Sequence, residues 1–138
     1  MKVIYLETSA LLHWLLGQSG AAEVRRQVDR AETVLTSMLT LTEAERALIR
    51  AEGEGLLKEG DAQRLRGLLN KAQLSWMRMA ISGDVLGRAA RPFPVEPVRT
   101  IDAIHLATAL EFAAAYPNLR VLSYDGRVRG NAEALGIM

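Results

Sequence analysis

The segment KVIYLETSALLHWLL, residues 2–16, joins two different patterns at one acidic residue. Lys2–Leu6 is a short apolar run rich in residues that favour β-structure, and it predicts a buried strand. Ser9–Leu16 is a second apolar run that stops at Gly17, and it predicts a helix with Thr8 as its capping residue. The segment therefore predicts a strand followed directly by a helix, with Glu7 at the junction.

The rest of the chain alternates in the same way. Further strands are expected at Thr33–Ser37 and Leu119–Tyr124, while Trp76–Ile81 is either a short strand or the end of a helix. Helices are expected between them, at Ala21–Ala31, Thr42–Glu54, Asp61–Gln73, from Ser82 to a point before Pro92, Thr100–Ala115 and Arg127–Leu135. Short apolar strands separated by helices predict an α/β/α sandwich with a mainly parallel central sheet.

The composition limits the chemistry. A chain of 138 residues is of single-domain size, so we expect one domain over 1–138. It has no cysteine, which excludes disulfides, thiolate zinc sites and cysteine nucleophiles. With two histidines, any metal ion would be held mainly by oxygen. The formal net charge of +1 requires no polyanionic partner. The N-terminus has no signal-peptide core and no apolar run is long enough for a membrane helix, so we expect a cytoplasmic protein without membrane association.

Four acidic residues lie where parallel sheets bind ligands, at the carboxyl ends of the strands. Glu7 and Asp125 directly follow predicted strands, whereas Glu43 and Asp102 lie in the first turns of predicted helices. A set of carboxylates without histidine or cysteine suits a hard cation such as Mg²⁺ or Mn²⁺. Two such cations would match the four charges and could activate water for phosphodiester hydrolysis.

Three of these acids also have a purely structural interpretation. Glu43 falls within two overlapping S/T-x-x-E capping boxes, and Asp102 would interact favourably with a helix dipole. Asp125 precedes Gly126, which is ordinary turn chemistry. Glu7 has no evident packing reason, and a buried charge must be paired or bind a metal ion.

Four segments resemble the PIN-domain family, specifically its VapC-type toxin ribonucleases: YLETSALL at 5–12, TSMLTLTEAERAL at 36–48, RTIDAIHLATAL at 99–110 and LSYDGRVRGNAEALGI at 122–137. The resemblance spans nearly the whole chain and implies a PIN-like α/β/α sandwich. It implies that Asp102 is a metal ligand, and it matches Glu43 and Asp125 to further acids of the family. With Glu7 these are the expected catalytic and metal-binding residues, Asp102 and Glu7 being foremost for direct contact.

The resemblance also implies an activity and partners. We expect a Mg²⁺- or Mn²⁺-dependent endoribonuclease that acts as the toxin of a toxin–antitoxin pair and leaves a 5′-phosphate. The expected partners are an RNA substrate, a cognate antitoxin protein that covers the acidic site, and a second copy of the chain in a homodimer.

Glu7 departs from the family pattern, in which the first acid is normally Asp. Its side chain is one methylene longer, and a misplacement of about 1 Å can cost on the order of 100-fold in rate. A shifted but working site, a weakened enzyme and a substitution that tames a toxic protein all remain open. The alternative function is a catalytically silent PIN domain that binds RNA or a protein without cleavage. A small-molecule phosphohydrolase would need a closed pocket.

Other residues admit both functional and structural interpretations. His105 lies one turn after Asp102 and is either a partner of the site or a packed polar residue. Thr8 and Ser9 either hydrogen-bond the site or cap the first helix. The remaining candidates are arginines that could hold RNA phosphates or simply be exposed, tryptophans that could stack on bases or pack, and a histidine that could take part in the chemistry or pack: Arg46, Arg99, Arg127, Trp14, Trp76 and His13.

Overall fold

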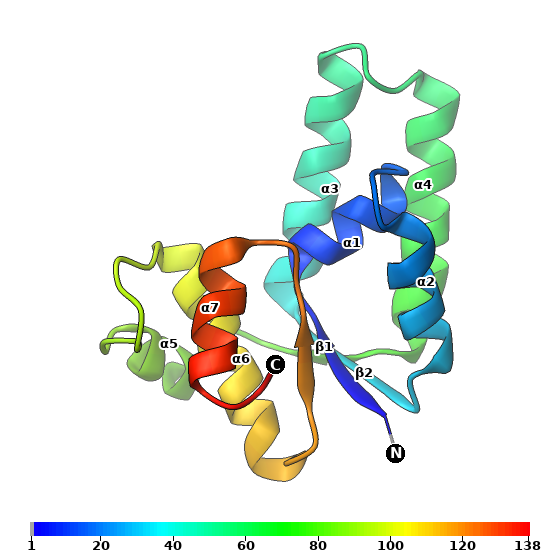
Figure 1. Ribbon diagram of the computed structural model, residues 1–138. Coiled ribbons are helices and arrows are strands. Elements are labelled where there is room, and N and C mark those ends of the chain that lie inside the picture. The colour runs from blue at the N-terminus through cyan, green and yellow to red at the C-terminus, as the bar shows by residue number, and fades with distance from the viewer. Residues whose placement is uncertain (1) are drawn as a thin grey trace.

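The structure, a computed structural model, describes residues 2–138 (Figure 1); Met1, part of the expected domain, lies outside the described residues. Its strands form one sheet in the order β3-β2-β1-β4, and every neighbouring pair is parallel. The strands are β1 (Val3–Leu6), β2 (Thr33–Ser37), β3 (Met77–Met79) and β4 (Arg120–Leu122). Ile4 in the central strand pairs with Val34 on one side and Arg120 on the other.

Helices cover both faces of this sheet. They are α1 (Thr8–Leu15), α2 (Ala21–Arg30), α3 (Met38–Gly53), α4 (Glu59–Ala72), α5 (Gly83–Ala89), α6 (Thr100–Ala115) and α7 (Gly126–Ala134). In Figure 1, α5, α6 and α7 lie on one side of the strands and α1, α2 and α4 on the other, while the far ends of α3 and α4 project as a hairpin. The expected α/β/α sandwich with a parallel sheet is confirmed.

The central strand β1 is buried on both faces because its side chains alternate. Val3 and Tyr5 belong to the core cluster formed with α6 and α7, whereas Ile4 and Leu6 belong to the cluster formed with α1 and α2. A strand that is buried on both faces has a continuous apolar sequence instead of an alternating one. This is why the short run at the N-terminus predicted the centre of the sheet.

The start of α1 differs from its prediction. Glu7, not Thr8, is the N-cap, and its carboxylate accepts a hydrogen bond from the Ser9 N–H. Thr8 is the first helical residue, and its hydroxyl donates to Glu43. The N-cap needs a side-chain oxygen that accepts one of the first free N–H groups, and the Glu7 carboxylate fills that role.

The start of α3 also differs. The helix begins at Met38, and Ser37, the last residue of β2, caps it by accepting the Leu39 N–H at 3.0 Å. Glu43 therefore lies in the second turn, and its prediction in a first turn within capping boxes is wrong. Because Ser37 ends the strand and caps the helix at once, no loop separates the two elements.

Smaller differences lie at the edges of the sheet. Trp76–Ile81 contains the edge strand β3, which follows a single 3-10 turn at Gln73–Ser75. The strand β4 is shorter than Leu119–Tyr124, and α4 begins two residues before Asp61. Within residues 2–138, no helix is both long and apolar enough to cross a bilayer.

Candidate active site

The four predicted acids all lie at the carboxyl edge of the sheet. Glu7 directly follows β1, Asp125 follows the adjacent strand β4, and Glu43 is on α3, which continues directly from β2. Asp102 is in the first turn of α6. The structure divides them into two pairs that differ in what their carboxylates contact.

Glu43 and Asp102 form the first pair and line one cavity of about 310 Å³, together with Arg99, Thr100 and Ile101. Asp102 is 7% exposed, and the start of α6 carries the positive end of the helix dipole, which stabilises its charge. The side chain of Glu43 is 25% exposed. This cavity therefore holds two carboxylates that remain accessible to a ligand.

Two donors hold Glu43 in place. The Thr8 hydroxyl donates to its Oε1 at 2.6 Å, and His105 Nε2 lies 2.5 Å from the same oxygen. Burial by itself would raise the pKa of Glu43, but the hydrogen bonds from His105 and Thr8 outweigh it and hold this pKa below its usual value. Glu43 is therefore an ionised carboxylate at neutral pH.

Arg99 links the two pairs of acids. Its Nε lies 3.1 Å from Asp102 Oδ2, and its Nη2 lies 3.5 Å from Asp125 Oδ2. The hydrogen bond to Asp102 and the charge of that residue raise the pKa of Arg99. The Arg99 side chain is 67% exposed, so solvent screens both ion pairs. Of the three arginines proposed to hold phosphates, Arg99 is the one that lies between the acids, while Arg46 and Arg127 are exposed on their helices.

The carboxylates of Glu7 and Asp125 form the second pair, and both cap helices. Asp125 Oδ1 accepts the N–H groups of Arg127 and Val128 at 2.9 and 3.1 Å, at the start of α7. Glu7 is 4% exposed and accepts three hydrogen bonds, from the Ser9 N–H, the Ser9 hydroxyl and the Ser123 hydroxyl. Through Ser123, Glu7 ties the end of β1 to the end of β4. Its carboxylate does not line the cavity of Glu43 and Asp102.

The acidic and histidine side chains of the site decide whether it can hold a divalent metal ion. Among residues 2–138, no group of three or more histidine and acidic side chains is arranged to hold one. Magnesium, however, is commonly bound by one or two carboxylates, with water and substrate phosphate oxygens completing the coordination. Glu43 and Asp102, which face the same cavity, fit this smaller donor set.

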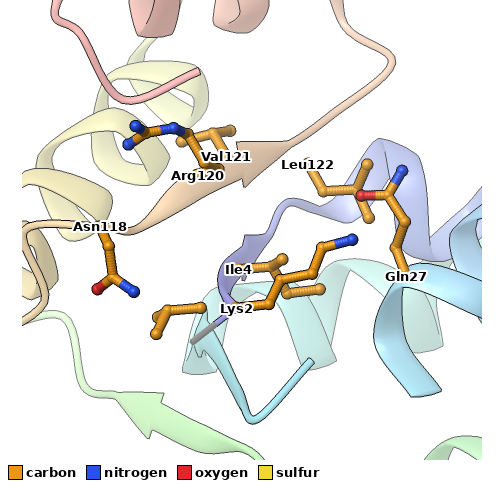
Figure 2. Close-up of a pocket in the computed structure, with 8 residues that line it drawn as sticks. Lys2, Ile4, Gln27, Asn118, Arg120, Val121 and Leu122 are labelled. Carbon is orange, nitrogen blue, oxygen red and sulfur yellow. The ribbon is translucent and has the colours of Figure 1, made fainter. Parts of the chain in front are cut away.

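A larger cavity, of about 410 Å³, lies along β1 and β4 (Figure 2). Its lining includes Lys2, Gln27 and Arg120 beside apolar residues of β1 and β4. Figure 2 shows the side chains of Lys2 and Arg120 extending away from each other. Because its charged groups do not converge, this cavity is a weaker candidate than the smaller acidic one.

The roles of several polar residues of the site were not predicted from the sequence. Tyr5 and Ser123 fall within predicted strands and carry no predicted role in the site, yet the Tyr5 hydroxyl lies 2.9 Å from His105 Nδ1 and Ser123 donates to Glu7. A signal was present for Tyr5, since its hydroxyl lies within an otherwise apolar run, Val3–Leu6, that is buried throughout. The sequence allows His105 to be either a partner of the site or a packed residue, and it is both, being 2% exposed and in contact with Glu43.

The other aromatic candidates are packing residues. Trp76 is buried in the core cluster with α1 and α2, and Trp14 packs against that cluster. The His13 ring stacks on Tyr124 with centroids 4.2 Å apart, and its Nδ1 lies 2.8 Å from the Ser19 carbonyl oxygen. These contacts agree with the structural interpretation of all three residues.

Residues 4–133 match the PIN domain family. Ribonuclease VapC46 of Mycobacterium tuberculosis is 32% identical over 137 residues, which cover 99% of this chain and 95% of that protein. Ribonuclease VapC35 of the same organism is 31% identical, with 98% and 93% covered.

Solved structures agree on the fold. The crystal structure of Mycobacterium tuberculosis VapC20, a sarcin-ricin loop cleaving toxin, aligns with a TM-score of 0.68 at 16% identity and covers 98% of this chain and 96% of that one. A toxin–antitoxin complex from Klebsiella pneumoniae aligns with a TM-score of 0.58 at 17% identity, covering 88% and 86%. At these identities the likeness concerns the fold alone.

Proposed function

Because the chain belongs to the PIN-domain family, and within it to the VapC-type toxins, we propose that it is a metal-dependent endoribonuclease acting as the toxin of a type II toxin–antitoxin pair. The observation that carries this proposal is the cavity at the carboxyl edge of the sheet, lined by Glu43 and Asp102. The relatives that are about one-third identical to this chain, over almost their full length, are named ribonucleases.

In this proposal Glu43 and Asp102 hold Mg²⁺ or Mn²⁺. The bound cation supplies Lewis acidity and positive charge for the attack of water on an RNA phosphodiester. Glu7 and Asp125 complete the acidic set from the strand ends, where they keep α1 and α7 in position. Arg99, exposed beside the cavity, is placed to bind a phosphate of the RNA when it leaves Asp102.

The same family membership supports the partners that we propose. These are RNA as substrate, a cognate antitoxin that covers the acidic cavity, and a second copy of the chain in a homodimer. The complex from Klebsiella pneumoniae, which has this fold, is a toxin bound to an antitoxin. We propose that the chain acts in the cytoplasm, where its RNA substrate is made.

The test is cleavage of RNA by the purified chain with and without Mn²⁺, beside Asp102→Ala and Glu7→Asp. The proposal predicts Mn²⁺-dependent cleavage that Asp102→Ala abolishes. Cleavage by Glu7→Asp alone would identify the chain as a disabled member of a nuclease family. If no version cuts any RNA offered, including total cellular RNA, the nuclease proposal is contradicted.

One observation favours a second candidate, a PIN domain that binds RNA or a protein without cutting. The Glu7 carboxylate already accepts three hydrogen bonds from Ser9 and Ser123, and it lies outside the cavity. In that case the chain would bind RNA equally well in Mn²⁺ and in EDTA, and Asp102→Ala would leave binding unchanged. Binding measured by fluorescence anisotropy in both conditions separates the two candidates.

A further inference from the structure

A chain of hydrogen bonds runs from the centre of the core to the acidic cavity. The Tyr5 hydroxyl on β1 lies 2.9 Å from His105 Nδ1 on α6, and His105 Nε2 lies 2.5 Å from Glu43 Oε1 on α3. Tyr5 is fully buried and His105 is 2% exposed, whereas Glu43 reaches the cavity. Three separate elements thus meet in one polar path.

The outer end of this path determines where one proton lies. The Thr8 hydroxyl already uses its proton in donating to Glu43 Oε1, and a carboxylate oxygen accepts hydrogen bonds. The short contact of His105 Nε2 with the same oxygen therefore requires a proton on Nε2. Thr8 Oγ1, 3.1 Å away, is a second acceptor for that N–H group.

The buried end of the path, at Tyr5, concerns the other ring nitrogen of His105, Nδ1. If the imidazole is neutral with its proton on Nε2, its Nδ1 is an acceptor, and the Tyr5 hydroxyl 2.9 Å away is the group that can donate to it. Burial, and next the charge of Glu7, raise the pKa of Tyr5, so the phenol keeps its proton. The order of donation is then from Tyr5 to His105 and from His105 to Glu43.

His105 also lies three residues after Asp102, on the same face of α6. This helix therefore controls both carboxylates of the cavity. It carries Asp102 itself, and it holds Glu43 through the His105 ring. The relative position of the two carboxylates therefore depends on α6 as well as on α3, which carries Glu43.

We propose that His105 is a positioning residue that holds Glu43 opposite Asp102 in the Nε2–H tautomer set by Tyr5. This inference rests on the proposed function, since it assigns how that site keeps its carboxylates ready for a divalent cation. Outer partners of metal ligands orient them, and their loss commonly weakens metal binding about 10- to 100-fold.

A purely structural role is the competing explanation. The Tyr5 ring packs edge-on against the His105 ring, 6.2 Å between centroids, and also against Phe112. If packing were their only role, variants would lose stability without altering the His105 tautomer or the affinity for metal. The test therefore needs both readouts in addition to cleavage.

The first experiment is ¹⁵N NMR of the full chain at neutral pH in EDTA, with the His105 signals identified by comparison with a His13→Gln variant. We expect a protonated Nε2 and a hydrogen-bonded, unprotonated Nδ1. In Tyr5→Phe, the Nδ1 resonance should move to that of a nitrogen without a hydrogen bond. A proton on Nδ1, whether in the other tautomer or in an imidazolium, would overturn the proposal.

The second experiment measures Mn²⁺ affinity by electron paramagnetic resonance without RNA. His105→Leu should weaken it about tenfold or more, Tyr5→Phe less, and His105→Gln least, because the glutamine amide can still donate to Glu43. Tyr116→Phe is the matched control, since the Tyr116 hydroxyl donates to Met77 Sδ, and no change is expected.

Equal losses in His105→Leu and His105→Gln, or none, would overturn the positioning role. A wild-type chain that binds no Mn²⁺ would contradict the proposed function itself, while the NMR result would still decide the hydrogen-bond order. The two failures are therefore distinguishable.

Discussion

The acids at the strand ends and the acids within helices make different contacts in this molecule. Glu7 and Asp125 stand immediately before α1 and α7, and both carboxylates accept backbone N–H groups of those helices. Glu43 and Asp102 stand inside α3 and α6, and their carboxylates line a shared cavity. The free N–H groups of a helix start compete for any carboxylate beside them.

The comparison shows that position at a strand end does not by itself make an acid a free ligand. A capping side chain contributes about 1 kcal/mol to stability, and a metal ion would have to offset that amount to release it. An acid one or more residues inside a helix does not serve as its cap, so no capping energy opposes metal binding there. The predictions below test this division, beginning with the largest expected effect.

Asp102→Asn should reduce RNA cleavage by about 100-fold or more, because loss of an outer partner alone already costs about 10- to 100-fold. Stability should change by no more than about 1 kcal/mol, since the relief of repulsion from Glu43 is offset by the loss of the favourable helix-dipole and Arg99 interactions. Single-turnover cleavage and thermal unfolding measure the two effects. Asp84→Asn, in the first turn of α5, is the matched control and should change neither. Undiminished cleavage by Asp102→Asn would remove this residue from the site.

Glu7→Ala should lower the free energy of unfolding by about 2 kcal/mol, because it removes a cap and leaves the Ser9 and Ser123 hydroxyls without their acceptor. Glu7→Gln should cost less, since the amide oxygen still accepts. Urea unfolding in EDTA measures this free energy. A drop in Mn²⁺ affinity with no loss of stability would show instead that Glu7 is primarily a metal ligand.

Asp125→Ala should cost about 1 kcal/mol through the lost cap of α7, which corresponds to a fall of about 3–5 °C in Tm. Asp125→Asn keeps an acceptor for the Arg127 and Val128 N–H groups and should stay within a few tenths of a kcal/mol of the parent chain. Thermal melts followed by circular dichroism compare the two. Equal Tm values for both variants would mean that the cap has no energetic role.

Removing the Arg99 guanidinium, which lies between the acids, should have a smaller effect. Exposed ion pairs contribute at most about 1 kcal/mol, so Arg99→Ala should tighten Mn²⁺ binding by at most about fivefold. The same change should weaken RNA binding in EDTA. Arg91→Ala, at another exposed position, is the control. Weaker Mn²⁺ binding by Arg99→Ala would show that the guanidinium supports the metal site instead of competing with it.

The pH dependence of stability should reveal Glu43. Its pKa in the folded chain is below its unfolded value, so its contribution is present above the unfolded pKa and is lost as pH falls through the folded pKa. The difference in unfolding free energy between the parent chain and Glu43→Gln should therefore shrink as pH falls below 4.5. Urea unfolding at several pH values measures it. A difference that grew on acidification would mean that the Glu43 pKa is raised instead.

Local patterns predicted most elements and failed where one residue serves two elements. The α6 and α5 starts were predicted correctly, since Thr100 follows a proline-rich segment and Ser82 is an ordinary cap. The start of α3 was missed because Ser37 both ends β2 and caps the helix. The edge strand β3 was ambiguous because three residues carry no clear period.

The sequence alone determined the fold class, the family and the presence of four acids at one edge of a parallel sheet, since these depend on local apolar patterns and strand order. Only the tertiary structure decided what each carboxylate contacts. Glu7 meets Ser123, and Glu43 meets His105, across separations of 116 and 62 residues. Such contacts depend on how helices pack on the sheet, which no local pattern of residues encodes.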